Sequence, residues 1–103
     1  MPFVFENLRV YQKAVDFAEK TSNLTDSFPR GNYYLSDQLN RAALSISANL
    51  AEGNGKFTAN DKRSFFYISR GSTHECVPLL EVAKRKKLIN SIDHEDLKKD
   101  LEV

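Results

Sequence analysis

The side chains of this sequence that could do acid–base or nucleophilic chemistry are few, and their spacing keeps them apart. Each of the two histidines is followed by a glutamate, in the pairs His74-Glu75 and His94-Glu95, and Cys76 is the only cysteine. Because adjacent residues point to different faces of a helix, we expect both histidines to be surface residues rather than metal ligands. Cys76 lies on an apolar stripe and is expected to be a small core residue. No nucleophile, base and orienting group occur together, so the sequence predicts that the protein is not an enzyme.

Two patterns that would hold a cofactor or a metal are incomplete. Residues 53–58, Gly-Asn-Gly-Lys-Phe-Thr, resemble a phosphate-binding loop, but Leu50 and Phe57 stand where that loop needs glycine and serine or threonine. A di-metal site in a helical bundle needs Glu-x-x-His on facing helices, and no glutamate here precedes a histidine by three residues. We interpret residues 53–58 as the end of one helix and the turn into the next, and we expect no cofactor and no metal.

Lysine and arginine are concentrated in the middle of the chain, although the net charge is only +1. Residues 56–90 carry eight Lys/Arg against three Asp/Glu, whereas residues 1–55 carry five against six and residues 91–103 carry two against five. Such an asymmetry can give a nearly neutral protein one basic face.

The spacing of these cations indicates a shared helix face. Arg63, Arg70 and Lys84 are separated by seven and fourteen residues, and residues 84–87 then add four consecutive positive charges. Cations also stabilise a helix C-terminus through its dipole, so a purely structural explanation of the run stays open. The functional interpretation is a surface that contacts phosphate groups. Its candidate residues are Lys56, Lys62, Arg63, Arg70, Lys84, Arg85, Lys86 and Lys87.

The periodicity of apolar residues predicts four helices in one domain, 1–103, at about residues 8–28, 36–52, 59–88 and 94–103. Asn7, Thr58 and Asp93 are the expected N-caps, and Pro78 is expected to kink the third helix. The predicted fold is all-α, an antiparallel up-and-down four-helix bundle with a short fourth helix.

The first helix carries two apolar stripes, which predicts that it is covered from two directions. Leu8, Tyr11, Val15 and Ala18 form one stripe, and Val10, Phe17, Leu24 and Phe28 form the other. The short fourth helix has too few apolar anchors to cover both. We therefore expect Val10, Phe17, Leu24 and Phe28 to lie at a subunit interface. The tail after Asp96 is expected to be loosely held or to dock on a neighbouring subunit.

Several polar residues lie close to the apolar face of the second helix. They are Gln38, Arg41, Ser45, Asn49 and Glu52. Buried polar groups need hydrogen-bond partners, so a structural network that fixes the helix register is favoured over a ligand site, which stays open as the alternative.

The sequence has no apolar run of the roughly 18 residues that a membrane span needs, and its first residues do not resemble a signal peptide. With a single cysteine, it fits a reducing compartment, and we expect a cytoplasmic protein without a membrane partner.

The sequence also resembles a bacterial four-helix-bundle family whose members are encoded in intervening sequences of large-subunit ribosomal RNA genes. The accessory variability proteins of diversity-generating retroelements are similar in fold. The resemblance spans about residues 3–92 and is carried by Phe5-x-x-Leu8-x-Val10-Tyr11-Gln12-x-Ala14, Ser27-Phe28-Pro29, Gln38-Leu39-x-Arg41-Ala42-Ala43-x-Ser45-Ile46-x-Ala48-Asn49-Leu50-Ala51-Glu52-Gly53-x-Gly55 and Gly71-Ser72-x-x-Glu75. It implies that the bundle assembles into a ring, typically a homopentamer. In the retroelement branch it implies binding to nucleic acid and to a reverse transcriptase. Pro78 and the short fourth helix depart from the family pattern.

Two functions are compatible with these observations. The first is a non-enzymatic, oligomeric binding module that contacts RNA or DNA backbone, or a nucleic-acid-handling partner such as a reverse transcriptase, through the basic surface of the third helix. The alternative is a structural or protein-binding scaffold with no nucleic-acid activity.

Overall fold

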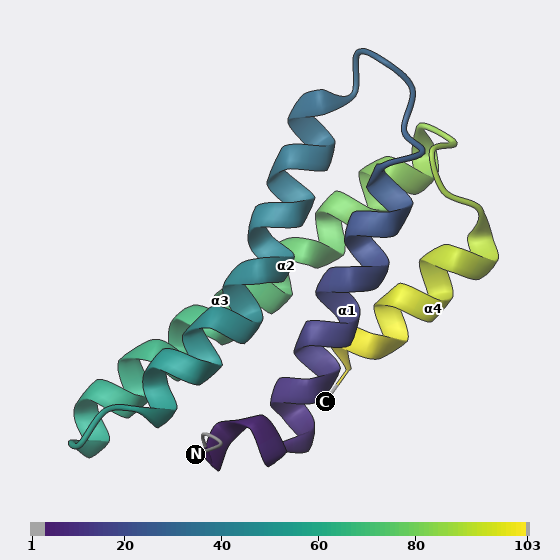
Figure 1. Cartoon of the computed structure of the whole chain (residues 1–103). Helices are drawn as coiled ribbons and strands as arrows, with labels where there is room; N and C mark the ends of the chain where they lie inside the picture. Colours follow the sequence, from purple (N-terminus) through teal and green to yellow (C-terminus); the bar gives the residue numbers. More distant parts are fainter. Residues whose placement is uncertain (1–3, 103) are drawn as a thin grey trace.

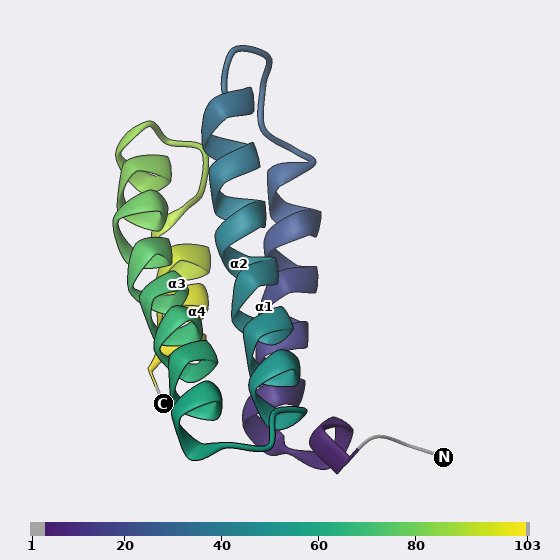
Figure 2. The same cartoon turned by 90° about the vertical axis from the view of Figure 1, so that its left-hand side faces the viewer.

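The computed structural model describes residues 4–102 and shows four α-helices and one short 3-10 helix, η1 (Val4–Asn7), with no strand in that range. The α-helices are α1 (Arg9–Thr25), α2 (Tyr33–Asn54), α3 (Ala59–Arg85) and α4 (Ser91–Leu101). Successive helices run in opposite directions, and the molecule is elongated, with principal extents of 44 × 23 × 22 Å (Figures 1 and 2). α1 contacts both α2 and α4, and α3 contacts the same two helices. The predicted all-α class is confirmed.

Capping residues account for two of the helix starts. The Thr58 side chain accepts a hydrogen bond of 3.1 Å from the Asp61 backbone N–H, as predicted for an N-cap. α4 begins earlier than predicted, because Asn90 rather than Asp93 is its cap, with Asn90 Oδ1 accepting from the Asp93 N–H at 2.7 Å. Asn7 is not the cap of α1, since Leu8 occupies that position without a side-chain hydrogen bond.

The core lies between the four helices. Its fully buried side chains include Leu35 and Leu39 of α2 together with Cys76 and Leu80 of α3. α2 and α3 approach closely at Gly53, where an added Cβ would lie 2.7 Å from Cε1 of Phe66. The absence of a side chain at residue 53 therefore lets Phe66 pack directly on the backbone of α2.

The prediction that Phe17, in the second apolar stripe of α1, lies at a subunit interface is wrong. That side chain is only 1% exposed within its own subunit, so no neighbouring subunit is needed to bury it. Leu24 and Phe28 are half-buried and pack against the same core, whereas Val10 is 39% exposed. Val15, of the stripe expected to face inward, is 41% exposed. α1 packs on α2 and α4 through the face that contains Phe17, which leaves Leu8 and Val15 of the first stripe exposed while Ala18 still packs against the core.

The tail after Asp96 docks on its own chain, contrary to the prediction. Helix α4 continues to Leu101, and Leu97 is 4% exposed. Lys20 Nζ of α1 lies 2.9 Å from Oδ2 of Asp100 and 3.5 Å from Oδ2 of Asp96. The hydrogen bond that Lys20 donates to Asp100 raises the pKa of Lys20. Ion pairs across α1 and α4 thus add to the few apolar contacts on which the prediction rested.

Pro78 lies inside α3, and the helix continues through it from Ala59 to Arg85. The kink expected there stays a prediction. Among residues 4–102, no helix is long and apolar enough to cross a membrane.

Candidate binding surfaces

The basic residues predicted to contact phosphate fall into two groups on α3. Residues 84–87 lie at its C-terminal end, and Lys62, Arg63 and Arg70 lie on its first half. Lys56 lies outside the helix, in the turn before α3, where its Nζ is 4.0 Å from Oε2 of Glu52 and 5.2 Å from the centre of the Phe65 ring. Lys56 thus lies against Phe65 at the start of α3 but is paired with Glu52 of α2, and the other candidate cations form two groups, one on the first half of α3 and one at its C-terminal end.

The end of α3 is closed by a backbone motif that uses part of the basic run. The Lys87 N–H donates to the carbonyl of Lys84 and the Leu88 N–H donates to the carbonyl of Ala83, both at 2.9 Å. This is the Schellman arrangement, and its residue after the cap has a positive φ, here 63° at Lys87. Arg85 pairs through Nε with Oε2 of Glu81 at 3.1 Å, and that bond lowers the pKa of Glu81.

Two exposed tyrosines of α2 lie beside this end of α3. Lys86 Nζ is 5.7 Å from the centre of the Tyr34 ring, which places the start of α2 against the end of α3 (Figure 2). Tyr33 and Tyr34 are 79% and 56% exposed. An exposed aromatic ring next to lysines can stack on a base while the lysines contact phosphate. The tyrosines were not among the predicted binding residues, because nothing in the sequence brings residues 34 and 86 together.

On the first half of α3, Arg63 and Arg70 are exposed, and neither has an ion-pair partner within residues 4–102. The backbone carbonyl of Arg70 is 2.9 Å from Nδ1 of His74. These two guanidinium groups are therefore positive charges that no carboxylate of the described chain neutralises.

The polar residues of α2 divide into a buried network and an exposed edge. Asn49 Nδ2 donates to the carbonyl and to Oγ of Ser45, at 2.8 and 2.9 Å, and Ser72 Oγ of α3 donates to Ser45 Oγ at 2.8 Å. Ser69 Oγ donates to the carbonyl of Ile46 at 2.9 Å. The bonds of Ser72 and Ser69 join α3 to α2, and those of Asn49 hold Ser45 within α2, as a structural network would.

The other three residues predicted for this network lie outside it. Gln38, Arg41 and Glu52 are exposed, and Arg41 pairs with Asp37 at 3.1 Å on the surface of α2. Ser69 was not predicted as a member of this network. Because it lies three residues before Ser72, on the same buried face of α3, its position in the sequence could have indicated this role.

The side chains considered for catalysis do not form a site. Cys76 is fully buried, and burial raises the pKa of its thiol to about 12, so it is protonated at neutral pH. His74 is exposed, but His94 is only 4% exposed, so its predicted surface position is wrong. Its Nε2 lies 3.9 Å from Oε1 of Glu81, because α4 begins early enough to turn residue 94 toward α3. No group of three His, Cys, Asp or Glu residues within 4–102 could hold a metal.

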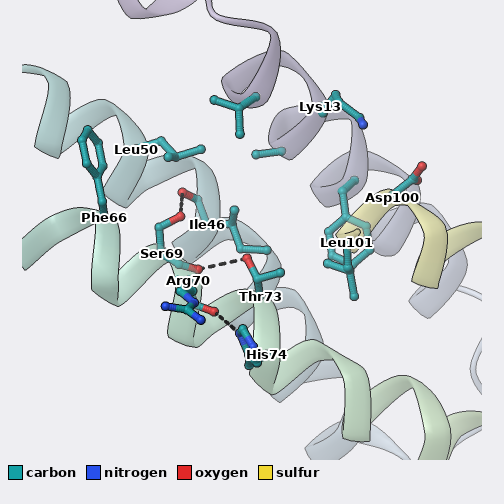
Figure 3. Close-up of a pocket in the computed structure, with 13 residues that line it drawn as sticks. Lys13, Ile46, Leu50, Phe66, Ser69, Arg70, Thr73, His74, Asp100 and Leu101 are labelled. Carbon is teal, nitrogen blue, oxygen red and sulfur yellow. Dashed lines mark hydrogen bonds between the residues drawn. The ribbon is translucent and has the colours of Figure 1, made fainter. Parts of the chain in front are cut away.

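An open groove of about 450 Å³ lies between α1 and α3, below the end of α4 (Figure 3). α4 spans 11 residues, about 16 Å, whereas α3 spans 27 residues, about 40 Å, so α4 covers only part of its neighbours. The floor of the groove is apolar, and it includes Val10, Phe17, Ile46, Leu50, Phe66 and Leu101. Lys13 lies on one side and Arg70 on the other, with Asp100 at the α4 end (Figure 3).

Taken together, the four helices define a small all-helical bundle protein with basic surfaces and an open groove. Residues 6–103 match the family described as 23S rRNA-intervening sequence protein, and the chain belongs to that family. Its fold is similar to a crystal structure from Bacteroides thetaiotaomicron, a protein with unknown function from the S23 ribosomal protein family. The two share 24% sequence identity with a TM-score of 0.83, over 90% of this chain and 88% of that one. No curated protein matches the sequence.

Proposed function

We propose that this chain is a non-enzymatic, self-associating module that binds the backbone of RNA or DNA through the basic surface of α3. The observation that carries the proposal is that most cations on and beside that helix have no ion-pair partner. Of the eight candidate cations on α3 and in the turns that flank it, only Lys56 and Arg85 form an ion pair within the described residues 4–102. The remaining six are Lys62, Arg63, Arg70, Lys84, Lys86 and Lys87.

Uncompensated cations on one helix favour a polyanion as the ligand. Each lysine or arginine that neutralises a phosphate releases bound counterions, and this release supplies most of the affinity of non-specific binding. Arg63 and Lys86 lie 23 residues apart, which corresponds to about 35 Å along a helix. A ligand that contacts both groups must be extended, as a nucleic-acid strand is. A nucleic-acid-handling protein such as a reverse transcriptase could be recruited through the bound strand.

Charge reversal tests this proposal directly. Arg63→Glu and Lys86→Glu should each weaken binding of a fluorescein-labelled single-stranded RNA at low salt by about tenfold or more, measured by anisotropy. The matched control is Lys99→Glu, which makes the same charge change at an exposed position of α4. Wild-type protein that does not bind RNA or DNA at low salt would refute the proposal, as would equal affinities for all three variants.

Self-association is part of the proposal, with a ring such as a pentamer as the expected form. Its support is the exposure of large apolar side chains on α1 and α2: Val15 is 41% exposed and Leu44 is 62% exposed. Light scattering of Leu44→Glu against wild type is the test: the wild type should be oligomeric and the variant should dissociate. A wild-type protein that is monomeric at micromolar concentration would contradict the proposed self-association.

A scaffold without nucleic-acid activity is the second candidate function. The hydrogen bonds among Ser45, Asn49 and Ser72 explain why these polar residues lie between α2 and α3 without any ligand. It predicts that α3 charge reversals leave all binding properties unchanged.

A further inference from the structure

Among residues 4–102, a fourth helix covers only part of the groove between α1 and α3. In a four-helix bundle each groove between two helices is covered by a third, and α4 covers this one only as far as Leu101, which lines its end. Beyond that residue, Val10 and Phe66 are each 39% exposed on the two walls. Exposed apolar side chains on facing helices are a typical binding surface for another helix.

The dimensions of the groove fit a short helix. On α3 its lining extends over nine residues, from Phe66 to His74, or about 12 Å along the axis. That length holds about two helical turns, which present apolar residues at positions i, i+3 or i+4, and i+7.

The charged residues on the rim of the groove determine whether an acidic or a basic molecule binds there. Lys13 projects from α1 on one side and Arg70 from α3 on the other (Figure 3). Asp100 is the single carboxylate that lines the groove among the described residues, and it is held by Lys20 at 2.9 Å. A molecule that binds between Lys13 and Arg70 is therefore attracted more strongly if it carries negative charge on both flanks.

We infer that the α1–α3 groove binds an amphipathic helix of a partner protein, one that carries a short apolar stripe flanked by acidic residues. The apolar stripe packs on Val10, Leu50 and Phe66, and the acidic flanks lie against Lys13 and Arg70. This site shares Arg70 with the proposed nucleic-acid surface, but its other cation, Lys13, lies on α1 and is not part of that surface.

The test uses a fluorescein-labelled peptide of about 14 residues, long enough for three to four helical turns, with leucines at i, i+4 and i+7 and glutamates on both flanks. Fluorescence anisotropy at low salt should show saturable binding. A peptide with every glutamate replaced by lysine should bind at least tenfold more weakly. Circular dichroism should show that the acidic peptide gains helicity on binding.

Variants of the protein locate the site. Lys13→Glu should weaken the acidic peptide about tenfold, and it leaves the basic residues of α3 intact, so RNA affinity distinguishes this proposal from the proposed function. Val10→Asp should abolish peptide binding, and Lys99→Glu should leave it unchanged. A melting curve shows that each variant is folded.

Several outcomes would overturn the inference. They are an acidic peptide that does not bind at low salt, equal binding of the lysine peptide, and unchanged affinity in both Lys13→Glu and Val10→Asp. Displacement of the peptide from the groove by single-stranded RNA in the Lys86→Glu background would assign the groove to nucleic acid instead.

Discussion

Ser72 Oγ donates a hydrogen bond of 2.8 Å to Ser45 Oγ, and this contact links α3 to α2 inside a mainly apolar interface. Asn49 completes the arrangement from one turn further along α2, with two bonds to Ser45. All three side chains are buried or half-buried, so their bonds are made out of reach of most water.

Replacement of Asn49 by alanine should lower the free energy of unfolding by about 1–2 kcal/mol, because two part-buried hydrogen bonds are lost. Urea denaturation measures the change. The control is Gln38→Ala on the exposed edge of α2, which should stay within about 0.5 kcal/mol of wild type. Equal effects of the two substitutions would contradict the network.

Gly53 and Gly71 form a matched pair inside helices. Gly53→Ala should destabilise the protein by about 1–3 kcal/mol, since its Cβ would meet the Phe66 ring at 2.7 Å. Gly71→Ala meets nothing within 4 Å and should stabilise by about 0.5–1 kcal/mol through helix propensity. Thermal melts of both variants check the opposite signs, and a common sign would show that the close approach of α2 to Phe66 is not as described.

Lys87→Gly should raise the free energy of unfolding by about 0.5–1 kcal/mol, because glycine adopts the positive φ of 63° at that position without strain. Lys86→Gly is the control. Its φ of −79° is ordinary, so glycine there gains nothing and should destabilise. Chemical denaturation of the two variants should place wild type between them.

Cys76 should react with Ellman's reagent far more slowly in the native protein than in urea, because the thiol is fully buried. Its pKa, raised to about 12, lies above that of the unfolded thiol, so the unfolded state loses its proton first as pH rises. Stability should therefore be unaffected below about pH 8.5 and should fall between there and pH 12. Cys76→Ala should remove that alkaline component, and rapid native labelling at pH 8 would contradict the burial.

Apolar spacing was sufficient to predict the helices, because each helix buries one face and the 3.6-residue period records it. The same spacing could not decide which of the two α1 stripes faces inward. Phe17 and Val15 are both apolar, but Phe17 is 1% exposed and Val15 is 41% exposed, because the way α1 packs on α2 and α4 decides which face is covered. His94 was misplaced for a related reason: its burial depends on α4 starting at Ser91, one residue after the Asn90 cap.

The sequence was sufficient to predict which basic residues cluster along the chain, but not how they are arranged on the surface. Their clustering in residues 56–90 is visible in the sequence, whereas the pairing of Lys56 with Glu52 and the position of Lys86 over Tyr34 depend on how α2 meets α3. The groove was even less accessible to sequence analysis, since it results from the difference in length between α3 and α4 and from side chains of all four helices.

The salt dependence of RNA binding tests the central claim most directly. If the basic surface of α3 contacts phosphates, a plot of log affinity against log salt for single-stranded RNA should be linear, with a slope of about −0.7 for each phosphate neutralised. Arg63→Glu and Lys86→Glu should each make that slope shallower by about one such step or more, while Lys99→Glu leaves it unchanged. A wild-type affinity that does not change with salt, or slopes identical in all four proteins, would contradict the account.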